Sequence, residues 1–311
     1  MLQPTIEYDG VEIPDFGDRS YPYGIVEVTK RCNLRCKTCF FFQALQHPER
    51  NLTDDELIPK LRALQKRHAI KFVSLVGGEP LLRPVVVEAA AEIFPMAVMF
   101  TNGTLPIPDL PIAIGVSLDG PREINDEIRG DGGFDRVVAN LRAAPRPVFI
   151  QSVVTRRNAG LLEDFARELT GLPNVSGVIF SIYVPQKNDD SGLGFDLPSR
   201  DRVVDTLLHL KDRHGDFLLN ERRALELCHS STCREVTDRC DMKLRSLALD
   251  YRLQRRLPCC YGEDVDCDLC AAPTPFSQAA RREAAAVGSP NTLVGGMRTS
   301  ANRAEGESAS S

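Results

Sequence analysis

The sequence predicts an α/β protein: a partial (β/α)6 barrel followed by a small cysteine-rich extension. Apolar runs of strand length alternate with amphipathic runs of helix length over about the first two thirds of the chain. Three cysteines directly follow the first strand, and seven more are grouped near the C-terminus. Strands that alternate with helices are usually parallel and joined by right-handed crossovers, which fits an open barrel better than a sandwich.

Six strands and five helices are expected in this core. The strands are 25–29, 72–76, 97–101, 113–118, 148–154 and 178–183. The helices carry apolar stripes near 57–64, 85–93, 134–143, 161–170 and 200–213. The first helix is preceded by the capping-box pattern Thr53-x-x-Glu56, but Pro59 fits poorly inside it. We therefore expect a kink or a later start there.

Composition divides the chain into four parts. Residues 1–20 are polar and irregular and read as an extended lead-in, and residues 21–225 form the barrel core. Residues 226–272 are a cysteine-rich segment. Residues 273–311 are rich in Ala, Ser, Arg and Gly, have little apolar periodicity, and are expected to be disordered.

The overall composition excludes several classes of protein. A hydrophobic content of 42% and a charged content of 26% are ordinary for a globular protein. The net charge of −5 argues against a nucleic-acid partner. No apolar run approaches the roughly 20 residues of a transmembrane segment, and the N-terminus lacks the features of a signal peptide. We expect a cytoplasmic protein in which ten cysteines serve as metal or redox ligands.

The first cysteine group is Cys32, Cys36 and Cys39, spaced C-x3-C-x2-C. So short a loop can direct three sulfurs toward one metal centre but cannot supply a fourth sulfur ligand. Structural zinc requires four ligands, whereas a [4Fe–4S] cluster bound by three thiolates keeps one iron open for another molecule. The alternatives are a zinc site completed from a distant residue and reduced structural thiols.

Three further motifs stand where later strands end. Gly77-Gly78-Glu79-Pro80 follows the second strand, and its paired glycines allow the backbone to approach a ligand closely. Thr101-Asn102-Gly103 closes the third strand. Ser117 and Asp119 at the end of the fourth lie two apart, so they share one face and suit a ribose diol or an ammonium. Each motif could also be a structural turn or strand terminus.

Together these four motifs resemble the radical S-adenosylmethionine (SAM) superfamily over about residues 21–185. The resemblance implies that SAM chelates the open iron through its methionyl amine and carboxylate, and is cleaved reductively to a 5′-deoxyadenosyl radical. It also implies that the GGEP turn holds the methionyl ammonium and that flavodoxin or ferredoxin supplies the electron. The expected cofactor-binding residues are Gly77, Gly78, Glu79, Asn102, Ser117 and Asp119.

The resemblance has two departures. The run 125–134 resembles the peptide- and lipid-modifying branch of the family, which usually has His in place of Asn125. The residue before the third cysteine is commonly aromatic in the family and packs on adenine, but here it is Thr38. Adenine contacts are then expected from the neighbouring aromatic run, which could equally be core and loop anchors. This run is Phe40, Phe41 and Phe42.

The second cysteine group predicts an auxiliary metal site. Residues 240–259 read as a hairpin about Asp250-Tyr251, with a C-x2-C pair shortly after it. The arrangement resembles the SPASM/Twitch extensions, which carry auxiliary [4Fe–4S] clusters, although the full seven-cysteine SPASM spacing is absent. The expected ligands are Cys240, Cys259 (or Cys260), Cys267 and Cys270, and a structural zinc is the alternative. Cys228 and Cys233 are expected to be spare thiols.

These observations predict a radical SAM enzyme. Its substrate is an unidentified organic molecule, which could be a peptide, a lipid or another natural-product precursor. The alternative is a non-catalytic iron–sulfur or zinc protein on the same scaffold. The intact GGEP motif and the intact run Ser117-Leu118-Asp119-Gly120 argue against it.

Overall fold

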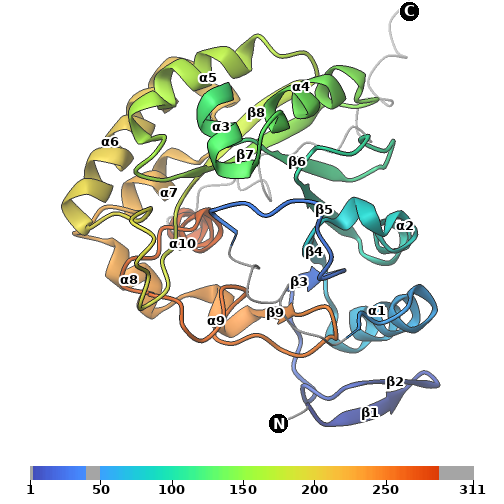
Figure 1. The fold of residues 1–311 in the computed structure, drawn as a ribbon. Coiled ribbons are helices and arrows are strands. Elements are labelled where there is room, and N and C mark those ends of the chain that lie inside the picture. The colour runs from blue at the N-terminus through green and yellow to red at the C-terminus, as the bar shows by residue number, and fades with distance from the viewer. Residues whose placement is uncertain (1–2, 40–49, 287–311) are drawn as a thin grey trace, which may run out of the picture.

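The computed structural model describes residues 3–39 and 50–286. A seven-stranded sheet in the order β8-β7-β6-β5-β4-β3-β9 curves into a partial barrel, and all its neighbouring strands are parallel (Figure 1). The predicted fold class is confirmed. The strands are β3 (Tyr23–Glu27), β4 (Phe72–Val76), β5 (Met96–Thr101), β6 (Ala113–Ser117), β7 (Val148–Val154), β8 (Val175–Ile182) and β9 (Ser246–Leu249).

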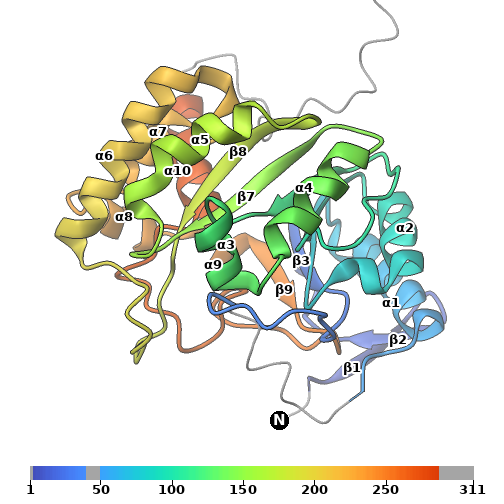
Figure 2. The same cartoon turned by 45° about the horizontal axis from the view of Figure 1, so that its top comes forward.

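Helices surround the sheet on its convex side, with the hydrophobic core between the two layers (Figures 1 and 2). The helices of the barrel are α1 (Asp54–His68), α2 (Pro84–Ile93), α3 (Arg122–Arg129), α4 (Gly133–Ala143), α5 (Leu162–Thr170) and α6 (Leu197–His214). Those of the C-terminal part are α7 (Arg222–Leu227), α8 (Cys233–Asp238), α9 (Asp241–Arg245) and α10 (Pro273–Ala286). Among the described residues, none of the helices has the length and apolarity needed to cross a membrane.

Pro59 led us to expect a kink in the first helix or a later start, but the helix does not start late. It begins at Asp54, where Thr53 and Glu56 form the predicted capping box, and it continues through Pro59. Both Pro59 and Asp55 are exposed, so the helical hydrogen bond that proline removes lies on the solvent side.

The N-terminal residues also differ from the expected extended lead-in. β1 (Thr5–Tyr8) and β2 (Val11–Pro14) form an antiparallel hairpin whose two-residue turn is Asp9-Gly10. Both turn residues have positive φ, at 52° and 74°. Asp-Gly is a strong signal for such a turn, and β2 then packs on α1 through the fully buried Ile13.

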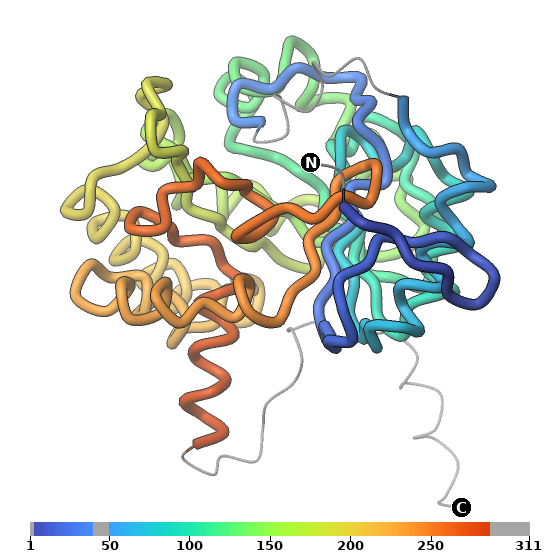
Figure 3. The backbone as a smooth tube through the Cα atoms, turned by 90° about the horizontal axis from the view of Figure 1, so that it is seen from below, coloured from blue at the N-terminus to red at the C-terminus, as the bar shows by residue number. Residues whose placement is uncertain are grey.

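The predicted cysteine-rich C-terminal extension is present, and it packs back on the barrel. β9 pairs in parallel with β3, and in Figure 3 the orange C-terminal segment runs beside the blue N-terminal part of the chain. The expected hairpin about Asp250-Tyr251 is reduced to one antiparallel bridge between Leu249 and Arg255, because its first arm is paired with β3 instead.

Part of the expected disordered tail is a helix. α10 packs against α7 and fully buries Phe276. Its alanines give it little apolar contrast, but they allow close packing between helices, which is why the prediction of disorder is wrong over 273–286.

Candidate functional site

The three thiols predicted to bind the cluster lie on one loop that follows β3. This cluster loop, residues 28–39, carries Cys32, Cys36 and Cys39 past α3 (Figure 2). The backbone N–H of Lys37 donates to the Ile128 carbonyl of α3 at 2.9 Å. All three cysteines are half-buried. They therefore stand at the strand ends, where active sites of parallel α/β folds gather.

Nitrogen donors from three elements face the thiols. The backbone N of Leu34 lies 3.4 Å from Cys32 Sγ, and Asn102 Nδ2 lies 3.9 Å from the same sulfur. Arg129 Nη1 lies 4.0 Å from Cys36 Sγ. Burial raises the pKa of Cys36, and the Arg129 guanidinium opposes that rise. Donors near sulfur stabilise the thiolate form that binds iron, so this donor set fits a [4Fe–4S] cluster.

The paired glycines bring the turn after β4 against the cluster loop. A Cβ on Gly77 would lie 2.4 Å from the Thr29 carbonyl oxygen, and one on Gly78 would lie 2.0 Å from that of Arg31. The N–H groups of Gly78 and Glu79 donate to Thr29 O and Arg31 O, both at 2.8 Å. The sequence indicated close approach to a ligand. In the structure the close approach is to the segment that carries the thiols.

Glu79 joins this turn to the turn after β5. Its side chain is fully buried, and its carboxylate accepts hydrogen bonds from Leu81 N at 2.9 Å and Thr101 Oγ1 at 2.7 Å. The other oxygen accepts from Asn102 N at 2.7 Å. Burial raises the pKa of Glu79, and these hydrogen bonds oppose the rise. The Asn102 side chain in turn donates to Asn33 at 2.8 Å, so three loops are fixed together.

The two polar residues at the end of β6 have different surroundings. Ser117 is half-buried, whereas Asp119 is fully buried. Asp119 Oδ1 accepts from Val153 N at 2.7 Å, and Oδ2 lies 2.8 Å from Arg129 Nη2. Of the predicted pair, only Ser117 keeps exposed surface, and the Asp119 carboxylate is engaged within the protein.

Sequence reasoning missed the residues that hold Asp119. Arg129 pairs with its carboxylate, Asn125 Oδ1 accepts from its backbone N at 3.1 Å, and Asn158 Nδ2 donates to its carbonyl at 2.7 Å. The resemblance drew attention to residues 125–134 but gave none of them a role. Because α3 was not predicted, nothing placed Arg129 near Cys36.

The C-terminal cysteines gather in the segment after β9. Cys240, Cys259 and Cys270 each accept a hydrogen bond from the backbone N–H two residues further along, as Cys32 does. Burial raises the pKa of Cys270 to about 12, and the nearby thiols of Cys240, Cys259 and Cys267 add to the rise. Cys270 is thus in electrostatic contact with each of the other three predicted auxiliary ligands.

The adjacent thiols of Cys259 and Cys260 are not equivalent. A hydrogen bond from Cys260 lowers the pKa of Cys259 to about 7. The same contact, with burial, raises the pKa of Cys260 well above its usual value. Cys259 is therefore the thiol of this pair that ionises first.

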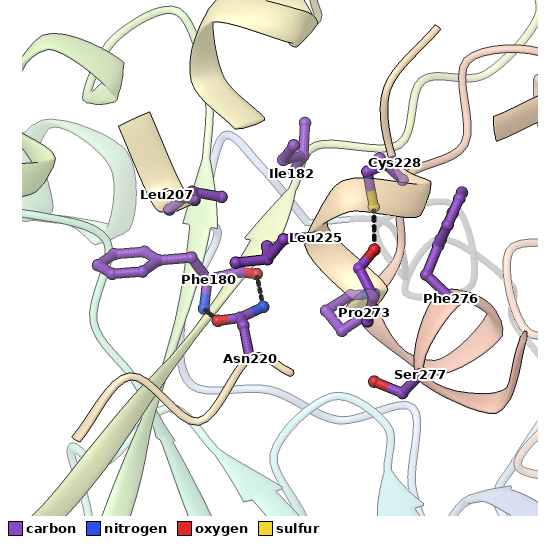
Figure 4. A pocket seen from close by; sticks show the side chains of 11 residues that line it. Phe180, Ile182, Leu207, Asn220, Leu225, Cys228, Pro273, Phe276 and Ser277 are labelled. Carbon is purple, nitrogen blue, oxygen red and sulfur yellow. Dashed lines mark hydrogen bonds between the residues drawn. The ribbon is translucent and has the colours of Figure 1, made fainter. Parts of the chain in front are cut away.

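The two remaining cysteines make separate contacts. Arg200 Nη2 lies 2.8 Å from Cys233 Sγ, and the Cys228 thiol donates to the Ala224 carbonyl at 3.3 Å. Cys228 borders a cavity of about 10 Å³ between β8, α6, α7 and α10 (Figure 4). That volume holds about one water molecule, and no residue of the cluster loop lines it. It is a packing gap of the core.

Within residues 3–39 and 50–286, no three His, Cys, Asp or Glu side chains converge on the position of a single metal ion. A cubane cluster makes no such demand, because each thiolate binds its own iron. The predicted adenine contacts Phe40, Phe41 and Phe42 lie outside the described residues, and Thr38 is half-buried.

Comparison with known proteins agrees with this site. Residues 26–155 match the Radical SAM superfamily. Mycofactocin maturase MftC of Mycobacterium tuberculosis is 35% identical over 158 residues, 45% of this chain and 39% of that protein. The AdoMet-dependent heme synthase of Methanosarcina barkeri is 32% identical over 176 residues, 50% of this chain and 48% of that protein. The chain spans less than half the length of either relative.

Solved structures share the fold at low sequence identity. The structure of anSMEcpe with bound AdoMet has a TM-score of 0.57 and 17% identity, and the match covers 77% of this chain and 74% of that one. Streptococcus suis SuiB bound to S-adenosylmethionine has a TM-score of 0.54 and 16% identity, with 75% and 59% covered.

Residues 26–155 are therefore similar to radical SAM domains, and the relatives named above are enzymes. The cofactors of this superfamily are a [4Fe–4S] cluster and SAM.

Proposed function

We propose that the protein is a radical SAM enzyme that cleaves SAM reductively and modifies an organic substrate. The observation that carries the proposal is the convergence of the GGEP and TNG turns on a loop with three half-buried thiols. When bound, the cluster supplies the electron for the cleavage and SAM supplies the 5′-deoxyadenosyl radical.

The protein's own residues would position these cofactors. Cys32, Cys36 and Cys39 would ligate three irons and leave the fourth for SAM. The GGEP turn holds the cluster loop through its two 2.8 Å backbone hydrogen bonds. The half-buried hydroxyl of Ser117 is available to a ribose hydroxyl or an ammonium, whereas the buried carboxylates of Glu79 and Asp119 act by holding neighbouring groups.

The substrate class remains peptide, lipid or another natural-product precursor, and peptides are the first class to test. SuiB and anSMEcpe have been solved with a precursor peptide and the Cp18Cys peptide, respectively, and both share the fold of this chain. The matched MftC is named a maturase. We further propose flavodoxin or ferredoxin as the electron donor.

Release of 5′-deoxyadenosine tests the proposal. Anaerobically reconstituted protein is incubated with SAM and dithionite, and the nucleoside is measured by chromatography. The wild type and the matched control Cys228→Ala, which changes a buried cysteine outside the cluster loop, should release it, and Cys32→Ala should not. Equal release by the wild type and Cys32→Ala would overturn the proposal, and a wild type that binds iron without any release would favour a non-catalytic scaffold.

We also propose that Cys240, Cys259, Cys267 and Cys270 hold an auxiliary [4Fe–4S] cluster. Their proximity and the backbone N–H donors at three of the sulfurs support it. Cys32→Ala protein should then retain roughly four iron atoms and as much acid-labile sulfide. Stoichiometric zinc without sulfide would instead establish a structural zinc site.

A further inference from the structure

Arg129 places a buried positive charge beside the cluster loop. Its side chain is 10% exposed and lies between the Asp119 carboxylate and the Cys36 thiol. Nη2 is 2.8 Å from Asp119 Oδ2, and Nη1 is 4.0 Å from Cys36 Sγ. Within the part of the chain that the structure describes, Nε has no hydrogen-bond partner. The guanidinium is therefore shielded from water and close to a ligand thiol.

The fold fixes this guanidinium from both sides. Arg129 is the last residue of α3, and the preceding Ile128 is buried and accepts the Lys37 N–H of the cluster loop at 2.9 Å. Asp119 is held by Val153 N at 2.7 Å. These contacts hold α3 and the Asp119 carboxylate in place beside the cluster loop.

A fixed charge near an iron–sulfur cluster changes its reduction potential. Reduction adds one negative charge to the cluster, which a nearby cation stabilises and a nearby anion destabilises, and burial weakens solvent screening of both. Within the ion pair, Arg129 makes the direct contact with a ligand thiol, since its Nη1 lies 4.0 Å from Cys36 Sγ. The net effect of the pair should favour the reduced cluster.

We propose that Arg129 is a positioning residue that raises the reduction potential of the cluster bound by Cys32, Cys36 and Cys39, and that Asp119 orients the guanidinium and partly opposes its charge. The inference rests on the proposed function, because it requires the cluster. No bond is made or broken in the step concerned, since one electron from dithionite or a reduced donor protein enters the cluster.

The two halves of the ion pair should shift the potential in opposite directions. The measurement is a redox titration of the full reconstituted chain without SAM, monitored by EPR, in which the component that Cys32→Ala lacks is assigned to this cluster. Arg129→Gln should lower the midpoint potential and Asp119→Asn should raise it, and the double variant should lie between them. Lys37→Gln is the matched control, because this cation on the same loop is 57% exposed and screened by water.

A merely structural role predicts a different pattern. Both variants would then lose iron or shift the potential in the same direction, and either result overturns the proposal. An unchanged midpoint in Arg129→Gln also overturns it, while leaving SAM cleavage by the wild type intact. If Arg129→Gln loses its iron, the midpoint potential of Asp119→Asn tests the inference instead. An unchanged or lowered midpoint in that variant contradicts the inference. A wild type that binds no cluster refutes the proposed function as well.

Discussion

A methyl group added at Gly78 should displace the cluster loop. The new Cβ would lie 2.0 Å from the Arg31 carbonyl oxygen, whereas ordinary van der Waals contact begins at 3.4 Å. The two segments must therefore separate by about 1.4 Å, and the contact is with backbone, which cannot rotate away. Arg31 directly precedes Cys32, so the separation is transmitted to the first cluster ligand.

The cost follows from the hydrogen bonds between the two segments. Gly78 N to Thr29 O and Glu79 N to Arg31 O are both 2.8 Å long, and a shift of this size breaks them. At 0.5–1.5 kcal/mol for each bond, Gly78→Ala should lower the free energy of unfolding by about 1–3 kcal/mol. We expect it also to lose most of the iron of the loop cluster.

Urea unfolding and iron content of reconstituted protein check this prediction, with Gly160→Ala as the control. A Cβ on Gly160 meets nothing within 4 Å, so that variant should stay within about 0.5 kcal/mol of wild type and keep its iron. The reasoning is refuted if Gly78→Ala matches Gly160→Ala in both measurements.

Three further predictions concern buried groups. Glu79→Gln puts an amide N–H₂ where an oxygen now accepts a hydrogen bond, for example from Asn102 N, and should lower the free energy of unfolding in urea by about 1–3 kcal/mol. Burial raises the pKa of Glu27 from 4.5 to about 7. Its favourable contribution to the free energy of unfolding is therefore complete below about pH 4.5 and is lost as the pH rises through 7. Arg256 lies 2.5 Å from Glu27 and limits that loss. Arg256→Met should therefore lower the free energy of unfolding by about 3 kcal/mol near pH 8 and by less near pH 5. Cys270→Ser should remove roughly half of the iron, as measured colorimetrically.

Each of these has a contrary outcome. A Glu79→Gln variant as stable as wild type would show that the carboxylate does not hold the two turns together. The same destabilisation of Arg256→Met at both pH values would mean that Glu27 does not titrate in this range. Undiminished iron in Cys270→Ser would remove this residue from the auxiliary site.

The barrel could be predicted from sequence because its signals are local. Most of the six strands are short Val- and Ile-rich runs, and the predicted helices between them carry apolar stripes on one face. The segment of β9 was predicted as an arm of a hairpin, but its pairing with β3 escaped prediction because β3 lies more than 200 residues earlier in the chain. α3 was missed because it has only eight residues, REINDEIR, and its apolar stripe consists of just Ile124 and Ile128.

The sequence predicted where the site lies but only part of the roles of its side chains. Cysteine spacing and glycine turns can be read from the chain, since strand ends of a parallel sheet lie at one edge. The roles of Glu79 and Asp119 could not, because they depend on which backbone N–H groups and which arginine face each carboxylate after folding. The same limit hid Arg129 until α3 placed it beside Cys36.

The most direct test of the account is the EPR spectrum of the reduced loop cluster with and without SAM. The experiment uses the Cys270→Ser variant, so that the cluster of Cys32, Cys36 and Cys39 is observed alone. If an iron of this cluster is open to SAM, adding SAM must change the g-values of the reduced cluster. A spectrum that SAM leaves unchanged, in protein that holds roughly four irons, would contradict the central claim.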